Sequence, residues 1–190
     1  SCPSPEAYLN AYQKAENIFV VTITSALSGS YNSAVTASNM LKEDAPEKNI
    51  LIIDSLATGP SLALIARKLS ELIDESDDFK HIADTIREYS KKVKLTFSLL
   101  SLDNLVKNGR VSKLVGAITS GLGITLIGRA SKEGTLEVVT KSRGSKKTYQ
   151  AMLNEMLHNN YKGGRVCISH CLNAEGVSYM KKLIKECFPN

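Results

Sequence analysis

The amino-acid sequence predicts an α/β protein of two domains, and two patterns lead to this prediction. Residues 19–24 and 50–54 are short, β-branched apolar runs, each followed by a small-residue loop and a helical pattern. Such runs are typical of parallel strands covered on both faces. Beyond residue 92 the order changes to β-α-β-β-α-β-α, which is typical of helices on a mostly antiparallel sheet. We expect a parallel-sheet α/β domain over residues 1–92 and a two-layer α+β sandwich over residues 93–190.

The first domain is expected to alternate helices with its two strands. Ser4-Pro5-Glu6 has the features of a helix start: a serine N-cap, proline at the first helical position and an acid in the first turn. Further helices are expected from Tyr31, over the apolar face of residues 62–69, and from Phe79. Two parallel strands cannot cover three helices, so this domain is incomplete here. We expect further strands from outside this chain or from segments missing at its ends.

The second domain is expected to contain a β-hairpin, with Lys132-Glu133-Gly134 as the turn between residues 124–130 and 135–140. Two other strands are expected at residues 93–99 and 165–170. The remaining segments have helical patterns: a short one at 112–118, one from Tyr149 and one from Val177.

Composition and charge exclude several classes of protein. The chain is 43% hydrophobic and 23% charged, which is ordinary for a globular protein. No run approaches the ~20 apolar residues of a membrane-spanning helix, so no stable membrane insertion is expected. The net charge of +5 is small. Because no basic stripe is interleaved with aromatic residues, no nucleic-acid partner is expected either. We interpret the basic cluster, defined here as Lys141, Arg143, Lys146 and Lys147, as a solvated surface.

The cysteines indicate a reducing compartment. Their spacing forms no disulfide framework and no secretory signal is visible, so a cytoplasmic location is expected. Cys167, His170 and Cys171 suggest zinc, but alternation along a strand would put the cysteines on the face opposite the histidine. No fourth ligand follows at a familiar spacing, and no metal or other cofactor is expected.

The loop Ser25–Ser30 is the most informative local feature. It follows a parallel strand, where open α/β sheets bind ligands, and it opens a helix whose unpaired N–H groups favour an anion. Ser28 and Ser30 add hydroxyl donors, and Gly29 allows close backbone approach. An ordinary strand-to-helix turn would have the same residues. The loop has neither the lysine of a phosphate-binding loop nor the pattern of a hydrolase nucleophile.

Three other residues have side chains that could act in a site. Asp54 ends the second strand, where a carboxylate can bind a metal, act as a base or cap a turn; capping is favoured, since the loop has no acidic partner. His170 is interpreted as a structural hydrogen-bonding residue and Arg143 as a surface charge. A shared cleft would be needed to bring them into one site.

Six motifs, in order along the chain, resemble the DegV family, the bacterial fatty-acid-binding proteins. The most specific is Thr22-Ile-Thr-Ser-Ala-Leu-Ser-Gly-Ser-Tyr-Asn-Ser-Ala34. The others are Ser1-Cys2-Pro3-Ser4-Pro5, Asp54-Ser55, Asn108-Gly109-Arg110-Val111-Ser112, Glu133-Gly134 with the later Arg143, and Ser169-His170 followed by Asn173-Ala-Glu175. The chain lacks the family's Lys-Pro at residues 124–128, its opening strand and its closing segment. It therefore resembles the middle of a family member.

The resemblance implies a non-catalytic carrier that holds one long-chain fatty acid in a tunnel, with the carboxylate near the domain interface. It implies that Ser28 and Gly29 bind the carboxylate together with the hydroxyl region at Ser1, and that His170 supports the head group. Arg143 would lie near the opening, where the acid is presented to the separate catalytic subunit of fatty acid kinase. Aliphatic faces around Leu62, Ile65 and Leu122 could line the acyl chain.

Two alternatives of other classes remain open. One is an enzyme, a phosphotransferase or hydrolase, that acts on a small anionic substrate through Ser28, Asp54 and His170. The spacing of these residues indicates no nucleophile–base pair, which weighs against the enzyme. The other is a regulatory domain that binds nucleic acid through residues 141–147, which predicts binding that weakens steeply with salt.

Overall fold

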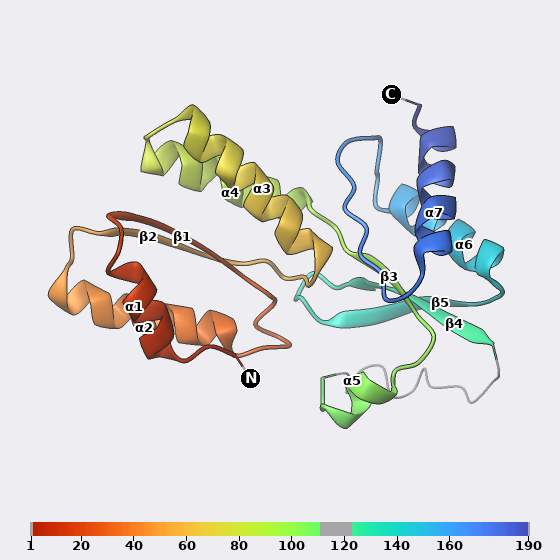
Figure 1. Ribbon diagram of the computed structural model, residues 1–190, viewed down its shortest axis with the longest axis horizontal. Helices are drawn as coiled ribbons and strands as arrows, with labels where there is room; N and C mark the ends of the chain where they lie inside the picture. Colours follow the sequence, from red (N-terminus) through yellow and green to blue (C-terminus); the bar gives the residue numbers. More distant parts are fainter. Residues whose placement is uncertain (1, 111–122, 190) are drawn as a thin grey trace. The chain divides into compact units, whose positions relative to one another are not determined.

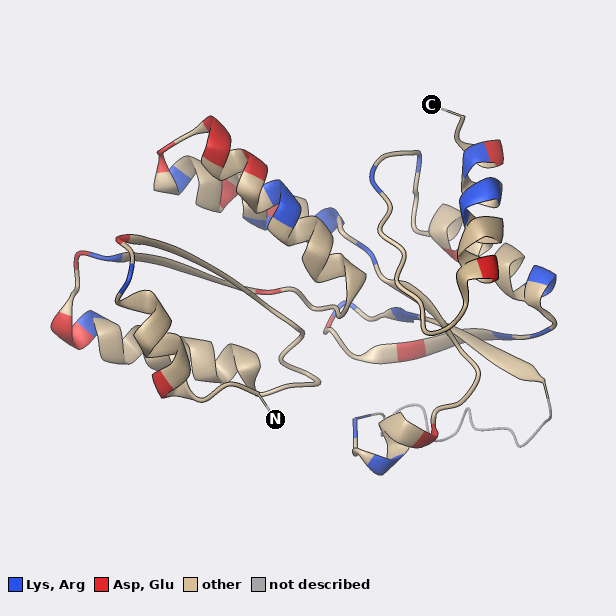
Figure 2. Cartoon of the chain, viewed as in Figure 1, with Lys and Arg blue, Asp and Glu red and all other residues tan. Residues whose placement is uncertain are grey.

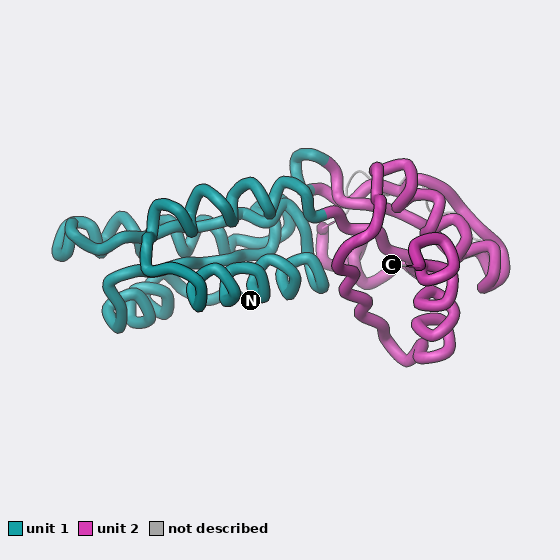
Figure 3. Tube along the Cα trace, turned by 90° about the horizontal axis from the view of Figure 1, so that it is seen from above, with its two compact units in different colours: residues 1–93, 132–134 teal, residues 94–131, 135–190 magenta. Residues whose placement is uncertain are grey.

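The computed structural model describes residues 2–110 and 123–189 (Figure 1). The described chain forms two compact units, coloured separately in Figure 3. Unit 1 comprises Ser1–Val93 with the turn Lys132–Gly134, and unit 2 comprises Lys94–Ser131 with Thr135–Asn190. One unit contains a parallel sheet and the other an antiparallel sheet, which confirms the predicted α/β class. The helix expected at 112–118 lies outside the described residues.

Unit 1 is built on two parallel strands. β1 (Asn17–Thr22) pairs with β2 (Asn49–Asp54) in a continuous register, from Asn17 opposite Asn49 to Thr22 opposite Asp54. The helices of unit 1 are α1 (Pro5–Tyr12), α2 (Ser30–Asp44), α3 (Pro60–Glu75) and α4 (Phe79–Lys92). Both strands and all four helices fall where the sequence predicts them, within a few residues at each end.

Helices cover both faces of this sheet, which is why the strands have apolar runs without alternation. On one face Leu51 and Ile53 pack with apolar side chains of α3 and α4. On the opposite face Ile18 packs with apolar side chains of α1 and α2. Figure 1 shows the same arrangement, with α3 and α4 on one side of the strands and α1 and α2 on the other. Burial of both faces therefore holds the two strands together.

Local caps and one buried hydroxyl fix the helices of unit 1. Ser4 Oγ accepts a hydrogen bond from the Ala7 N–H at 3.4 Å, which confirms the predicted start of α1. The Tyr12 hydroxyl donates to the Ala34 carbonyl at 3.1 Å and ties α1 to α2. Burial, and then the neighbouring Tyr8, raises the pKa of Tyr12 to about 12.

Unit 2 contains a three-stranded antiparallel sheet in the order β3-β4-β5. The strands are β3 (Thr96–Leu99), β4 (Ile124–Ala130) and β5 (Leu136–Arg143), and the last two form the predicted hairpin. Its turn includes Gly134, whose positive φ of 76° favours glycine. The helices are α5 (Asp103–Lys107), α6 (Ser145–His158), which packs against the sheet, and α7 (Ala174–Cys187), which packs against α6.

An ion-pair network fastens α6 to β4. Arg129 Nη1 lies 3.1 Å from Oε1 of Glu155, a carboxylate that is only 5% exposed, and Arg129 Nε lies 3.3 Å from Glu137 Oε2. Asn159 Nδ2 donates to the same Glu155 oxygen at 2.7 Å. These two carboxylates raise the pKa of Arg129. The buried acid is therefore paired and hydrogen-bonded, as a buried charge requires.

The prediction of a strand at residues 165–170 is wrong. The backbone there belongs to no strand, and most of its residues are exposed. An apolar run becomes a strand only where another strand supplies hydrogen-bond partners, and this segment pairs with none of β3, β4 or β5. The short helix α5 was not predicted; its five residues are too few to give a helical period.

Candidate functional site

Two loops leave the sheet of unit 1 at one edge, because β1 and β2 are parallel. Residues 23–29 connect β1 to α2, and residues 55–59 connect β2 to α3. Backbone hydrogen bonds link the loops: the Thr24 N–H donates to the Ala57 carbonyl at 2.9 Å and the Ser55 N–H donates to the Thr22 carbonyl at 3.2 Å. The pairing thus continues past the strands and holds the loops side by side.

Thr24 organises the first loop from inside. Its side chain is fully buried, and its Oγ1 accepts from the Ala26 N–H at 3.3 Å. Its carbonyl accepts from the N–H groups of Leu27 and Ser28 at 3.1 and 3.2 Å. These bonds form a tight turn that brings Ser28 to the start of α2.

Ser28 and Ser30 form a hydroxyl pair at that start. Their Oγ atoms lie 2.9 Å apart, and Ser28 Oγ also accepts from the Ser30 N–H at 3.2 Å. A hydroxyl has one hydrogen and two lone pairs. Ser30 can therefore donate to Ser28 while Ser28 donates to a ligand. The first N–H groups of α2 have no partner within the helix, and the helix dipole favours negative charge there. This arrangement suits a carboxylate or a similar small anion.

Gly29 lies close to the start of the described chain, and its backbone conformation does not require glycine. It is the N-cap of α2 with φ −71°, a value that any residue adopts. A Cβ at this position would lie 3.3 Å from Cys2 Sγ. The start of the described chain therefore lies against the loop. Ser1 itself, which the resemblance assigns to the site, lies outside the described residues.

Asp54 caps both loops. Its Oδ1 and Oδ2 each lie 3.2 Å from the Ser25 nitrogen, and its Oδ1 accepts from the Leu56 N–H at 3.1 Å. Leu56 has a positive φ of 50°, a conformation that costs a non-glycine residue about 1 kcal/mol. The hydrogen bond from its N–H offsets this cost. Since the carboxylate bonds to backbone N–H groups and Ser28 bonds to Ser30, these contacts do not form the nucleophile–base pair of the enzyme alternative.

His170 and Arg143 both belong to unit 2. The Asn173 N–H donates to His170 Nδ1 at 3.0 Å, so the neutral ring carries its hydrogen on Nε2. Asn173 is also the N-cap of α7, with Oδ1 accepting from the Gly176 N–H at 3.1 Å. Arg143 is exposed and ends β5 opposite Ile124, within the basic cluster.

The exposed cysteines form no metal site. Cys2, Cys167, Cys171 and Cys187 are all free and exposed. The predicted alternation of Cys167 and His170 does not apply, because these residues are not on a strand. Within residues 2–110 and 123–189, no group of three or more His, Cys, Asp or Glu is arranged to hold a metal ion.

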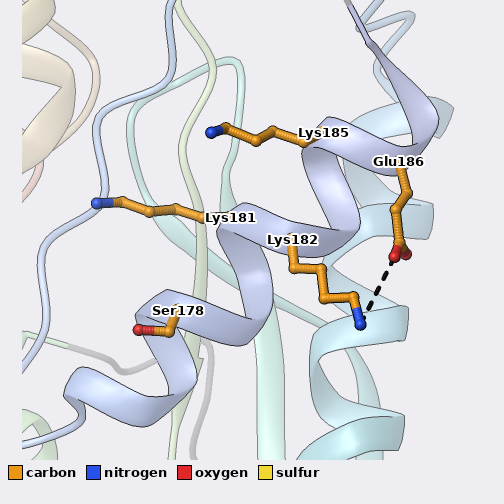
Figure 4. A pocket seen from close by; sticks show the side chains of 5 residues that line it. All are labelled: Ser178, Lys181, Lys182, Lys185 and Glu186. Atoms are coloured by element: carbon orange, nitrogen blue, oxygen red, sulfur yellow. Dashed lines mark ion pairs between the residues drawn. The ribbon is translucent and has the colours of Figure 1, made fainter.

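A shallow hollow of about 480 Å³ lies on α7 (Figure 4). It is lined by Ser178, Lys181, Lys182, Lys185 and Glu186, and Lys182 Nζ lies 3.8 Å from Glu186 Oε1. The sticks in Figure 4 show lysine side chains reaching outward from the helix. Polar and charged walls do not suit an acyl chain, so this hollow does not belong to the candidate site.

Charges of both signs are mixed along the helices, as Figure 2 shows for α3 and α4. Several are paired within one helix turn, such as Asp84 with both Lys80 and Arg87. On α3 and α4 this mixing leaves no face with basic residues alone. In the part of the chain that is described, no helix is both long and apolar enough to span a bilayer.

The fold and loop together define a class of protein. A parallel sheet whose strand ends carry a hydroxyl-rich loop at a helix start is typical of α/β proteins that bind small anionic ligands at that edge. The model of a family described as "Uncharacterised protein, DegV family" matches residues 1–190. The chain belongs to the DegV family.

Two curated relatives are similar to the whole of this chain. A DegV domain-containing protein of Streptococcus pneumoniae strain R6 is 46% identical over 189 residues, which cover 100% of this chain and 67% of the relative. A DegV domain-containing protein of Streptococcus gordonii is 45% identical over 190 residues, which cover 100% of this chain and 68% of the relative. The chain thus spans about two thirds of their length.

Three similar solved structures contain fatty acids. The S. pneumoniae Fatty Acid Kinase (Fak) B3 protein, loaded with linoleic acid, has a TM-score of 0.94 and 46% identity over 100% of this chain and 67% of that one. A DegV family protein from Eubacterium eligens, loaded with heptadecanoic acid, has a TM-score of 0.92 and 39% identity. The match covers 100% of this chain and 69% of that one. A DegV family protein from Ruminococcus gnavus, with vaccenic acid, has a TM-score of 0.90 and 34% identity. The match covers 99% of this chain and 68% of that one.

Sequence reasoning singled out the Ser28 loop as a candidate site and favoured a cap at Asp54, but it missed Thr24, which shapes the loop, and Asn173, which orients His170. Thr24 resembled any strand residue, although a threonine just past a strand end can form the side-chain turn that it makes here. Asn173 was noted only as part of a motif. Its place before an acid and a helical pattern is an N-cap signal that could have identified it.

The hydrogen bond from Asn173 to His170 predicts the tautomer of that histidine. At a pH where the ring is neutral, two-bond ¹H–¹⁵N NMR should show the hydrogen of His170 on Nε2, because Nδ1 accepts the backbone N–H. His81 and His158 provide reference signals in the same spectrum. A hydrogen on Nδ1 of His170 would contradict the described hydrogen bond.

Proposed function

We propose that this chain binds one long-chain fatty acid and acts as a cytoplasmic carrier with no catalytic activity of its own. The observation that supports this most is the Ser28–Ser30 hydroxyl pair at the start of α2, in a chain 46% identical to a linoleic-acid-loaded protein. The four free, exposed cysteines fit a reducing compartment.

The head group is proposed to bind at the loop Ser25–Ser30. A carboxylate only accepts hydrogen bonds, so it needs several converging donors. The Ser28 hydroxyl and the first-turn N–H groups of α2 that follow Ser30 are proposed as donors from unit 1, with Gly29 leaving the backbone accessible. Ser1 is proposed to add a further donor, and His170 to donate from Nε2. Hydrogen bonds to a charged acceptor are about twice as strong as neutral ones.

The acyl chain is proposed to supply most of the affinity from an apolar tunnel. Each buried CH₂ contributes about 0.8 kcal/mol, so a long chain outweighs a few polar contacts. Leu62 and Ile65 on α3 are proposed to contribute to its lining. Leu62 is half-buried and could face the acyl chain directly, whereas Ile65 is fully buried in the core of unit 1 and would support this lining from behind. Leu122, the third proposed lining residue, lies outside the described residues.

The partner is proposed to be the separate catalytic subunit of a fatty acid kinase, which would convert the bound acid to acyl phosphate. A relative with 46% identity is named Fatty Acid Kinase B3 protein. Arg143, at the end of β5 in the basic cluster, is proposed to face this subunit. Its exposed cation suits an acidic or phosphate-bearing partner surface. ATP and metal would come from the kinase.

The carrier proposal predicts a ligand that copurifies with the protein. Mass spectrometry of an organic extract should identify one C14–C18 fatty acid per chain, because burial of the acyl chain makes release slow. Delipidated protein that is mixed with fatty acid and extracted again should recover the same stoichiometry. An empty extract that stays empty after this reloading would contradict the proposal.

Arg143 should act in acyl phosphate formation by the kinase and not in fatty-acid binding. Replacement of Arg143 by alanine should leave fatty-acid affinity within about twofold but slow acyl phosphate formation by the kinase at least about tenfold, through loss of a charged contact. Arg67→Ala, which removes an exposed arginine on α3, is the matched control. Equal transfer rates for the Arg143 variant and the parent would exclude this role.

A further inference from the structure

We propose that Asp54 positions the loop Ser25–Ser30, here called the head-group loop, so that disturbing its hydrogen bonds to this loop weakens fatty-acid binding. The inference rests on the proposed function, in which the carboxylate of the ligand binds at the loop Ser25–Ser30. Asp54 is a positioning residue in this account. Its effect on the ligand passes through the backbone that it holds.

The hydrogen bonds of Asp54 reach both loops at the carboxyl ends of the strands. Both of its oxygens lie 3.2 Å from the nitrogen of Ser25, the first residue of the head-group loop. Its Oδ1 also accepts from the N–H of Leu56, in the loop after β2. One side chain therefore fixes the start of the loop that carries Ser28 relative to its neighbour.

From Ser25 the constraint passes along a short, hydrogen-bonded path. The buried Thr24 closes the turn by accepting hydrogen bonds from the N–H groups of Ala26, Leu27 and Ser28. At the end of the turn, Ser28 Oγ lies 2.9 Å from Ser30 Oγ. A shift at Ser25 therefore displaces the hydroxyl that is proposed to donate to the ligand. Hydrogen bonds weaken steeply when their geometry is disturbed, so a small displacement is enough to reduce head-group binding.

The direction in which the fatty-acid affinity changes in an Asp54 variant distinguishes a positioning role from simple charge repulsion. A carboxylate near an anion site repels the ligand, so charge removal alone would strengthen binding. Asparagine keeps the size of Asp54 but can accept with only one of its two terminal atoms. Its amide would present hydrogens where Ser25 or Leu56 already donates one. Positioning therefore predicts weaker binding in Asp54→Asn, and electrostatics predicts tighter binding.

The test compares an acid with its neutral analogue. Affinities for linoleic acid and for linoleyl alcohol are measured on the parent protein and on Asp54→Asn. We expect the acid to bind about five- to tenfold more weakly in the variant, and the alcohol to change by less than about twofold. The alcohol keeps the acyl chain but has no charge for the loop to hold. A purely structural defect would weaken both ligands equally.

A matched variant controls for the loss of an aspartate cap. Asp78 accepts a backbone N–H from His81 at 3.1 Å at the start of α4, also in unit 1. Asp78→Asn should leave the binding of both ligands unchanged. Asp54→Glu keeps the charge but moves the carboxylate by one CH₂. It should reproduce the selective loss of acid binding, and it serves as the second variant if Asp54→Asn does not fold.

Several outcomes would overturn the inference. Tighter or unchanged acid binding in the folded Asp54 variants would show that the residue does not position the loop, and so would an equal loss of acid and alcohol. If the parent protein binds neither ligand, the proposed function fails and this inference fails with it. A parent that binds both ligands, with variants of unchanged selectivity, overturns only the role of Asp54.

Discussion

The parallel pairing of β1 with β2 is the constraint on which the candidate site depends. Parallel strands end at the same edge, so the loops that follow them become neighbours although about 30 residues separate them in sequence. Helices pack on both faces and hold the pair in register. A shift in this register would separate Asp54 from the Ser25 N–H and alter the turn at Thr24. The chemistry of the Ser28 loop therefore depends on packing that lies outside it.

Different interactions hold the elements of the two units together. In unit 1 apolar burial on both faces of the sheet sets the frame, and hydrogen bonds between backbone and short side chains shape the loops at its edge. In unit 2 an ion pair between Arg129 and the buried Glu155 fastens a helix to the sheet. Within that unit the Asn173 N–H sets the tautomer of His170, which a head-group role requires. Both candidate donors, Ser28 and His170, are thus oriented by backbone groups.

Much of the fold could be predicted from the sequence, because its signals are local. The serine cap and proline of α1, the apolar strands and the hairpin turn at Gly134 each lie within a few residues. The strand predicted at 165–170 was wrong because a strand depends on a partner, and the partner is not a property of the segment. The loop of Ser28 was identifiable from its small residues. The bonds from Asp54 to Ser25 and from Asn173 to His170 depend on the fold and its turns, which residue types alone do not specify.

The central claim is that the carboxylate of a fatty acid binds at Ser28. Linoleic acid labelled with ¹³C at its carboxyl carbon tests it directly by NMR, on the parent protein, Ser28→Ala and the control Ser33→Ala. The account predicts one bound carboxyl resonance in the parent, which moves in Ser28→Ala with about tenfold weaker binding and stays in place in Ser33→Ala. An identical resonance and affinity in Ser28→Ala would contradict the claim.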